Sequence, residues 1–505
     1  MCENMDNLGH IINGEITHES GEPIKIFNPT SGDIISSVCN PSSETIEKAL
    51  ISSQQAYEEW KEFSIAKRAS ILFDYKVLLE NNIDELAKII SKDLGKVYDD
   101  AVGEIRRGIE NVEYACGIGE IIKGEYNKNI STAVDSWSEF YPLGTVLGIT
   151  PFNFPAMVPL WMFPLAIAAG NSFILKPSEK DPLGSMFIVD LFNKTKAPRG
   201  LLNLLNGDKT VGAKLIKDKR IKAVSFVGST PVAKKIYESA AISGKRCQAL
   251  GGAKNHALIL PDADIDYTTD QLISASFGSS GQRCMALSVA VVFSSVKEKF
   301  ISILKNKVSK LKFGLDDLNS NSFGPLVSKE HLESVKKYIS MSEEEGAQIV
   351  IDGRDLIKGK NSNNGYFLGP TIIDNVNSGM ESYQNEIFGP VLQIIEVDEI
   401  SKAIKLINDN KFGNGCCIFT SNGEKARKFS QHVDIGMVGV NIPLPVPSSY
   451  HSFGGWKNSL FGDLNIYGPD GVRFYTQRKT ITQRWPDSSG ESIGINLSMP
   501  NNLKQ

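Results

Sequence analysis

The chain has 505 residues, of which 41% are hydrophobic and 22% charged, enough for two or three domains with separate cores. Its 54 Lys and Arg against 58 Asp and Glu give a net charge of −4, so charge does not favour a nucleic acid or an anionic membrane as partner.

Cysteine and histidine usage excludes two further classes of protein. The seven cysteines form no CxxC pair, which is typical of a reduced protein rather than a disulfide scaffold. The six histidines are scattered, so a metal site has no support. The chain begins without a signal-peptide pattern, and we therefore expect a cytoplasmic protein.

The first half of the chain predicts helices followed by a parallel sheet. Apolar residues recur at helical spacing over 42–63, with Ser43 as the expected N-cap, and further amphipathic patterns cover 72–81, 83–94 and 99–118. Short β-branched runs then alternate with helical patterns, at 144–150, 171–176, 200–206 and 221–228. Such alternation predicts a parallel sheet with helices on both faces.

One stretch without charge, between Glu139 and Lys176, superficially resembles a membrane span. It contains five prolines, which would break a spanning helix, and asparagines that would be costly in lipid. We expect a buried strand, a loop, a buried helix and a second strand instead.

The strand and helix pattern restarts after Gly252. A strand over 256–261, a helix near 267–279, a loop at 280–285 and a strand over 288–293 predict a second α/β unit. The fold class is therefore α/β, with two open, largely parallel twisted sheets that carry helices on both faces. The polar segment 486–505 has too little apolar content to pack and is expected to be disordered.

The strongest local motif is FGSSGQRCMA at 277–286, which sets Cys284 in a turn rich in glycine and serine. Such a turn exposes a sulfur atom near backbone N–H donors, which suits a nucleophile. Arg283 beside it is expected to lower the thiol pKa from its usual value of about 8.5. A buried structural cysteine is the alternative.

Four further motifs are weaker, and three of them lie at the ends of predicted strands. TPFNFP at 150–155 holds Asn153 rigidly between prolines, as an oxyanion donor or simply as a turn cap. LKPSE places Lys176 and Glu179 at a strand end, where open parallel sheets bind ligands. SFVGST at 225–230 suits a phosphate at a helix start, and NEIFGP at 385–390 precedes a Gly-Pro turn.

Together these motifs resemble the NAD(P)-dependent aldehyde dehydrogenase superfamily. PFNFP, LKPSE, FVGST, LGGAKN, GQRC and EIFGP occur in the family's order, and the similarity runs to about Trp485. No GxGxxG fingerprint is present, but this superfamily binds the cofactor without it. Within the superfamily the chain most resembles the CoA-acylating methylmalonate-semialdehyde dehydrogenase branch, through RRGIENVEYACG, GQRCMALS and NIYGPDGVRFYTQRKTITQRW.

The resemblance implies roles for individual residues. Cys284 falls on the catalytic thiol and Asn153 on the oxyanion amide. The positions implied to contact NAD are Thr150, Phe152, Lys176, Glu179, Lys180, Ser229, Gly251, Glu386 and Phe388. A carboxylate at Glu179 favours NAD over NADP, because it accepts bonds from a ribose hydroxyl and repels a 2′-phosphate.

The second half-reaction depends on Leu250. Hydrolytic relatives carry a glutamate general base in an ELGGK-type motif, whereas this chain reads QALGGAKNH and has Leu250 in the glutamate's place. General-base help is worth about 10² to 10⁴ in rate, so hydrolysis should be slow, while a thiol such as CoA needs less help. The alternatives are another residue as base, a hydrolytic enzyme of the succinate-semialdehyde type, and a non-catalytic protein on the same fold.

The resemblance also implies a substrate class. Arg107 and Arg283 fall on positions associated with holding the substrate carboxylate, for which a guanidinium is well suited. For Arg107 the alternative is a solvated helix residue, and for Arg283 it is tuning of the thiolate alone. The expected reaction converts malonate or methylmalonate semialdehyde into acetyl-CoA or propionyl-CoA, CO2 and NADH, as in valine or inositol breakdown.

Finally, the resemblance implies an oligomer and a domain plan. The expected NAD-binding domain covers 1–123 and 143–251, and the catalytic domain covers 252–455. Segments 124–142 and 473–485 would form a small ribbon that joins subunits, and TQRKTITQRW alternates as an edge strand would. Relatives are commonly tetramers, but a dimer is not distinguished from a tetramer by the sequence.

Overall fold

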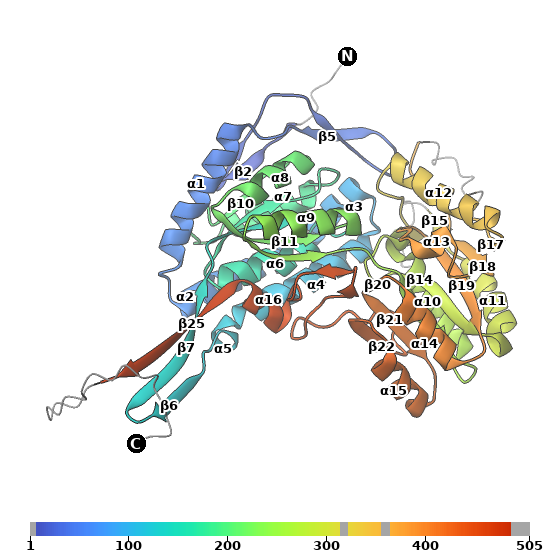
Figure 1. Ribbon diagram of the computed structural model, residues 1–505. Helices are drawn as coiled ribbons and strands as arrows, with labels where there is room; N and C mark the ends of the chain where they lie inside the picture. The colour runs from blue at the N-terminus through green and yellow to red at the C-terminus, as the bar shows by residue number, and fades with distance from the viewer. Residues whose placement is uncertain (1–6, 314–321, 355–363, 486–505) are drawn as a thin grey trace, which may run out of the picture.

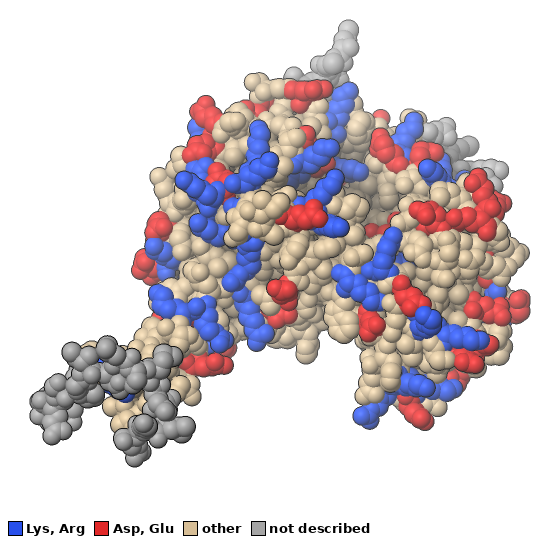
Figure 2. Space-filling model, viewed as in Figure 1, with Lys and Arg blue, Asp and Glu red and all other residues tan. Residues whose placement is uncertain are grey.

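The computed structural model describes residues 7–313, 322–354 and 364–485, so the expected disorder of 486–505 lies outside the described residues. Two sheets lie in neighbouring lobes, and a narrow ribbon extends away from the first lobe (Figure 1). This arrangement confirms the predicted fold class. Lys and Arg are mixed with Asp and Glu over the visible face, in keeping with the small net charge (Figure 2).

The first sheet has eight strands. Its five central strands run parallel, and the strands at both edges join antiparallel. In spatial order the strands are β24 (Leu460–Phe461), β12 (Arg246–Leu250), β11 (Ile221–Val227), β8 (Thr145–Ile149), β9 (Ser172–Lys176), β10 (Leu202–Leu204), β2 (His10–Ile12) and β3 (Glu15–Thr17). The sequence patterns predicted four of the central strands but missed β12.

Helices cover both faces of this sheet. The core on one face takes side chains from α1 (Ser43–Trp60), α8 (Lys209–Lys217) and α9 (Thr230–Ile242). The other face packs against α2 (Ile65–Asn81), α3 (Ile83–Leu94), α4 (Tyr98–Cys116), α6 (Met157–Ala168) and α7 (Leu183–Asn193). Every residue of α6 is buried, so the uncharged stretch forms the predicted core helix. Among the described residues no helix is long and apolar enough to cross a membrane.

The N-cap of α1 is Ser42, not the expected Ser43. The Ser42 hydroxyl accepts a hydrogen bond from the backbone N–H of Thr45, at 3.1 Å, and Ser43 is already the first helical residue. Either serine can cap a helix, and the choice depends on which one has extended backbone angles.

The second sheet has seven strands, all parallel except the edge strand β17. In spatial order they are β17 (Gln348–Ile351), β18 (Thr371–Asp374), β19 (Val391–Val397), β14 (Leu287–Phe293), β13 (Asn255–Ile259), β21 (Gly415–Phe419) and β22 (Met437–Val440). Helices α10 (Ile265–Phe277) and α11 (Ser294–Val308) cover one face, and α12 (Lys329–Glu344), α14 (Ile400–Asp409) and α15 (Gly423–His432) cover the other.

The chain changes sheets between Leu250 and Asn255, near the boundary expected at 251. The exact division into domains stays a prediction. Smaller elements complete the chain: β1 (Asn7–Leu8), β4 (Ile24–Phe27), β5 (Ile34–Val38), α5 (Ile118–Ile121), β15 (Lys312–Phe313), β16 (Ser322–Phe323), α13 (Glu381–Gln384), β20 (Phe412–Gly413), β23 (Trp456–Lys457) and α16 (Gly468–Phe474).

The ribbon consists of three antiparallel strands in the order β25 (Thr476–Arg484), β7 (Val134–Pro142) and β6 (Tyr126–Ser131). The segments predicted for it do pair with each other, residue for residue from Thr476 to Arg484. The buried side chain of Asn171 joins this ribbon to the first lobe. Its amide oxygen accepts from the N–H groups of Leu143 and Gly144, and its amide nitrogen donates to the carbonyls of Ala166 and Tyr475.

We predict that Asn171→Ala destabilises the fold by about 2–4 kcal/mol, because it leaves buried backbone groups without partners. Urea unfolding measures the loss. Asn127→Ala on the exposed surface of β6 is the matched control and should cost less than about 0.5 kcal/mol. Equal stability of the two variants would show that the Asn171 bonds do not hold the ribbon in place.

Candidate active site

Cys284 lies in a tight loop between α10 and β14. After α10 the short 3-10 turn η1 (Gly278–Gly281) contains two serines in left-handed conformation, Ser279 with φ 50° and Ser280 with φ 54°. The carbonyl of Cys284 accepts hydrogen bonds from the side-chain amides of Asn255 and Asn414, both at 2.9 Å. The backbone of Cys284 is thus held by the first residue of β13 and by the residue directly before β21, two neighbouring strands of the second sheet.

Gly281 allows this loop to touch a second loop, which carries Glu386. Gly281 has φ +69°, and a Cβ there would lie 2.1 Å from the carbonyl oxygen of Gly389. Only glycine fits both the backbone angle and the space. The loops that carry Cys284 and Glu386 are therefore in backbone contact.

A cavity of about 340 Å³ opens beside Cys284, within the size range of small-molecule sites. It lies between the carboxyl ends of strands of the first sheet, where open α/β sheets bind ligands, and the loops that lead into strands of the second sheet. Among the residues singled out in the sequence, the cavity wall contains Phe152, Asn153, Ser229, Leu250, Gly251, Cys284, Glu386 and Phe388.

Asn153 connects the two sheets at this cavity. It follows β8 of the first sheet, and its side-chain nitrogen donates to the carbonyl of Gln282, in the Cys284 loop, at 2.9 Å. The side chain of Gln282 is itself fixed, because its amide oxygen accepts from the N–H of Val327 at 3.0 Å. A primary amide has two N–H groups. One is used here, and the other is available to a ligand in the cavity.

Burial and, to a smaller extent, the charge of Glu386 raise the pKa of the Cys284 thiol to about 12. Backbone N–H groups and the nearby Arg283 act in the opposite direction but are weaker. The expectation that Arg283 lowers this pKa below its usual value is therefore wrong. The physical reason is that loss of hydration in a closed cavity outweighs one partly neutralised cation.

Glu386 is the carboxylate that lines the cavity. One of its oxygens accepts from the backbone N–H of Ala253 at 2.9 Å, and burial raises its pKa to about 7. Gly252 leaves the room for this carboxylate, since a Cβ there would lie 2.3 Å from it. Below it the buried ammonium of Lys254 donates to the carbonyls of Ser382 and Asn385, and burial lowers its pKa to about 7.

Leu250, at the end of β12, is almost fully buried and presents its side chain to the cavity. The position implied for a general base thus carries no ionisable group. Besides Glu386 and Cys284, the titratable side chains in the cavity wall are His331 and Tyr338 of α12.

The sequence analysis did not identify His331 as a site residue, because it belongs to no motif. Its Nε2 lies 2.8 Å from the carbonyl oxygen of Phe388, and a carbonyl only accepts, so Nε2 carries the proton. This bond holds Phe388 at φ +56°, a left-handed conformation that is rare for a bulky residue. Phe388 then stacks edge-on against Phe152, with ring centroids 5.9 Å apart.

The remaining residues implied for NAD lie at the edge of the first sheet, outside the cavity wall. Lys176 at the end of β9 pairs with Glu179 at 2.9 Å, and the ammonium of Lys180 lies 5.6 Å from the ring of Phe152. The buried hydroxyl of Thr150 has no partner among the described residues. Ser229, in the cavity wall, precedes α9, and its side chain makes no capping bond.

The two arginines do not line the Cys284 cavity. Arg107 pairs with Glu110 on the exposed side of α4, at 2.8 Å. Arg283 lines a second cavity and pairs with Asp100 at 2.5 Å. Arg107 is nevertheless close to Tyr467. Burial raises the pKa of the Tyr467 hydroxyl, and the charge of Arg107 opposes this rise.

Among the described residues, no group of three His, Cys, Asp or Glu side chains is arranged to hold a metal ion. The site offers instead a thiol, an amide, a carboxylate and helix-start N–H groups, which suit covalent catalysis beside a nucleotide.

Comparison with known proteins identifies the family. A profile of the aldehyde dehydrogenase family matches residues 16–481. The chain belongs to the aldehyde dehydrogenase family. It is 50% identical to a malonate-semialdehyde dehydrogenase of Pseudomonas aeruginosa, over 95% of this chain and 97% of the relative.

Two crystal structures share the fold and nearly the full length. One is a methylmalonate-semialdehyde dehydrogenase from Oceanimonas doudoroffii, with a TM-score of 0.94, 52% identity and coverage of 96% of this chain and 99% of that one. The other, from Sinorhizobium meliloti 1021, is assigned as a methylmalonate-semialdehyde dehydrogenase and contains NAD. Its TM-score is 0.94, its identity 43% and its coverage 96% and 99%. The resemblance to the family is thus confirmed.

We predict that Glu386→Gln moves the pH dependence of Cys284 alkylation to lower pH. The carboxylate charge raises the thiol pKa, so removing it lowers that pKa, while the glutamine oxygen still accepts from Ala253. Iodoacetamide labelling, followed on the Cys284 peptide by mass spectrometry, gives the midpoint. Glu424→Gln, on exposed α15, should leave the midpoint unchanged. An unshifted midpoint in Glu386→Gln would disprove the coupling.

Proposed function

We propose that this protein oxidises malonate semialdehyde and methylmalonate semialdehyde with NAD+ and coenzyme A. The products are acetyl-CoA or propionyl-CoA, CO2 and NADH. The observation that carries the proposal is one cavity with a thiol, an amide donor and Leu250 in place of a base. The malonate- and methylmalonate-semialdehyde dehydrogenases that it resembles at 50% and 52% identity support the substrate class.

In the proposed first half-reaction the Cys284 thiol loses its proton and the sulfur attacks the aldehyde carbon. The carbonyl oxygen becomes an oxyanion, to which the free N–H of Asn153 donates. The chemistry that NAD+ supplies here is acceptance of a hydride from that carbon. Cys284 is then left as a thioester.

The residues present fit a bound dinucleotide. The glycines at 251 and 252 leave a wall without side chains, where a Cβ would meet Thr230 or Glu386. The start of α9 behind Ser229 suits a pyrophosphate. Glu386 would accept from the nicotinamide ribose, and the Lys176–Glu179 pair would bind the adenosine ribose. Phe152, Phe388, Thr150 and Lys180 would line the path between them.

In the proposed second half-reaction the acyl group leaves Cys284. A β-carboxy thioester loses CO2 by breaking its carbon–carbon bond, and the carbon takes up a proton. The thiol of CoA then attacks the thioester, and Cys284 recovers its thiol. Leu250 cannot take a proton from water, which favours CoA as acceptor. Glu386, with a pKa of about 7 in the same cavity, favours the hydrolytic alternative as second candidate.

Arg107 and Arg283 are proposed to bind the substrate carboxylate. Tyr467 links Arg107 to the cavity, because its ring stacks on Phe453 of the cavity wall with centroids 5.8 Å apart. Arg283 would have to break its ion pair with Asp100 in order to bind the substrate. Its guanidinium would then bind only aldehydes that carry a carboxylate.

Oligomer, location and domain plan complete the proposal. The outer edge of β25 pairs with no other strand among the described residues, and an unpaired edge favours association, here as a homo-tetramer or dimer. The six described cysteines are free thiols, as expected in the cytoplasm. The NAD-binding domain would comprise 1–123 and 143–251, and the catalytic domain 252–455.

The proposed acceptor is tested by omitting CoA. We predict that wild-type enzyme then forms NADH in one burst equal to its active sites, and turns over at least about 100-fold more slowly than with CoA. Leu250→Glu should speed CoA-independent turnover, and Leu250→Gln, of the same size without a base, should not. Release of free acid by the wild type at full speed without CoA would overturn the proposal. If Glu386→Gln then lost that hydrolytic activity, Glu386 would be the general base.

The proposed carboxylate contact is tested by Arg107→Leu. We predict a rise in KM for malonate semialdehyde of about 10- to 100-fold, the loss expected of a charged hydrogen bond, with kcat/KM for propanal unchanged. Arg106→Leu, on the neighbouring exposed residue, is the control. Equal losses on both aldehydes would assign Arg107 a structural role.

A further inference from the structure

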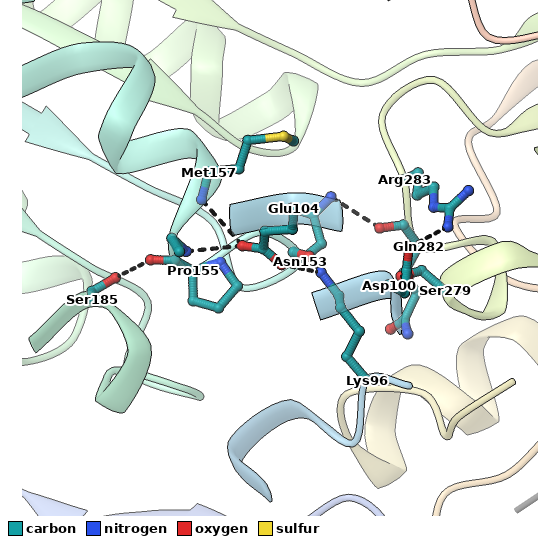
Figure 3. A network of polar contacts seen from close by, with 11 residues as sticks. Lys96, Asp100, Glu104, Asn153, Pro155, Met157, Ser185, Ser279, Gln282 and Arg283 are labelled. Carbon is teal, nitrogen blue, oxygen red and sulfur yellow. Dashed lines mark hydrogen bonds and ion pairs between the residues drawn. The ribbon is translucent and has the colours of Figure 1, made fainter. Parts of the chain in front are cut away.

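The loop that carries Asn153 is anchored by a buried ion pair outside the cavity wall. The ammonium of Lys96 donates to the backbone carbonyl of Asn153 at 2.7 Å and pairs with Glu104 at 2.5 Å. The other oxygen of Glu104 accepts from the N–H groups of Ala156 and Met157, at 2.9 and 3.2 Å, at the start of α6 (Figure 3). The pair therefore holds both ends of this loop.

The pair is a poor device for stability alone. The side chains of Lys96 and Glu104 are 2% and 0% exposed, and burying two charges removes their hydration. Replacing such a pair with uncharged side chains is often neutral or even stabilising. Every hydrogen bond of these two charged groups among the described residues goes either to the partner charge or to the backbone between Asn153 and Met157. The Lys96 ammonium also lies 4.3 Å from the ring centroid of Phe154 in the same loop. These bonds therefore determine the geometry of the loop that carries Asn153.

The same helix face also holds the Cys284 loop. Asp100 and Glu104 are four residues apart on α4, so they lie on one face of the helix. Asp100 accepts from the hydroxyl of Ser279 and pairs with Arg283 at 2.5 Å (Figure 3). Although burial opposes it, the charges of Arg283 and Lys96 lower the pKa of Asp100, so the carboxylate is ionised at neutral pH.

We propose that α4 sets the distance between the oxyanion amide and the nucleophile, with Lys96 and Glu104 as positioning residues for Asn153. Glu104 and Lys96 fix the Asn153 loop. Asp100, one helical turn away, fixes the Cys284 loop through its bond from Ser279, which does not depend on Arg283. The inference rests on the proposed function, in which Asn153 stabilises the oxyanion on the Cys284 adduct. Preorganised donors of this kind lose effect when they move, because they must meet charge that develops only in the transition state.

The test is a double-mutant cycle read on the single-turnover NADH burst without CoA. Lys96→Met with Glu104→Gln replaces the pair with uncharged side chains of similar size. The glutamine oxygen can still cap α6, but the bond to the Asn153 carbonyl is lost. We expect this variant to lower the burst rate about tenfold in the wild-type background. In the Asn153→Ala background, which by itself loses about 10²- to 10³-fold, it should lower the rate less than twofold.

Controls separate positioning from folding and from the chemistry itself. Glu113→Gln, on the exposed side of α4, should leave the burst unchanged. Should the double replacement not fold, Ser185→Ala removes an uncharged anchor of the same loop, the bond from its hydroxyl to the Pro155 carbonyl at 2.6 Å. It should lower the burst about threefold, again only when Asn153 is present.

The outcomes are distinct. A lower burst rate only in the wild-type background, in which Asn153 is present, supports the proposal. Equal fractional losses in both backgrounds, or no loss in either, would overturn it and leave the proposed function standing. An unchanged burst in Asn153→Ala alone would instead refute the oxyanion contact of the proposed function.

Discussion

In the proposed reaction two groups from different sheets must meet at one carbonyl group, and this requirement agrees with the arrangement of the molecule. The amide of Asn153 follows a strand of the first sheet, and Cys284 precedes a strand of the second. The hydrogen bond from Asn153 to the Gln282 carbonyl joins them directly. Neither lobe contains the site alone, so the packing of the lobes is itself part of the catalytic geometry.

Burial at this junction pushes ionisable groups toward their neutral forms. The pKa of Cys284 and that of Glu386 are raised, and the pKa of Lys254 is lowered, all mainly by burial. The thiol and the carboxylate also oppose each other, because ionisation of one makes ionisation of the other less favourable. A hydrogen-bond donor that points at the adduct lowers the free-energy cost of a negative charge in the cavity. A nucleophile of this kind becomes reactive when that cost falls.

The sequence predicted the two sheets, the ribbon and the residues in short loop motifs next to strands, because alternation and strand ends leave clear local patterns. Asn153, Cys284 and Leu250 belong to this class. The sequence did not reveal the roles of His331, Asn255, Asn414, Lys96 and Glu104. No motif assigns a role to any of them, and each role depends on contacts with segments far away in the chain. The pKa of Cys284 and the direction in which the Arg283 side chain points were unpredictable for the same reason. Burial of the thiol and the pairing of Arg283 with Asp100 arise only when the chain folds.

The contact between Gly281 and Gly389 has a consequence for traffic through the site. With two backbones touching, the nucleophile loop and the Glu386 loop cannot slide past one another, and they travel as a single piece. Release of one bound molecule from the cavity and entry of the next then require either that the lobes separate or that side chains such as Phe388 rotate.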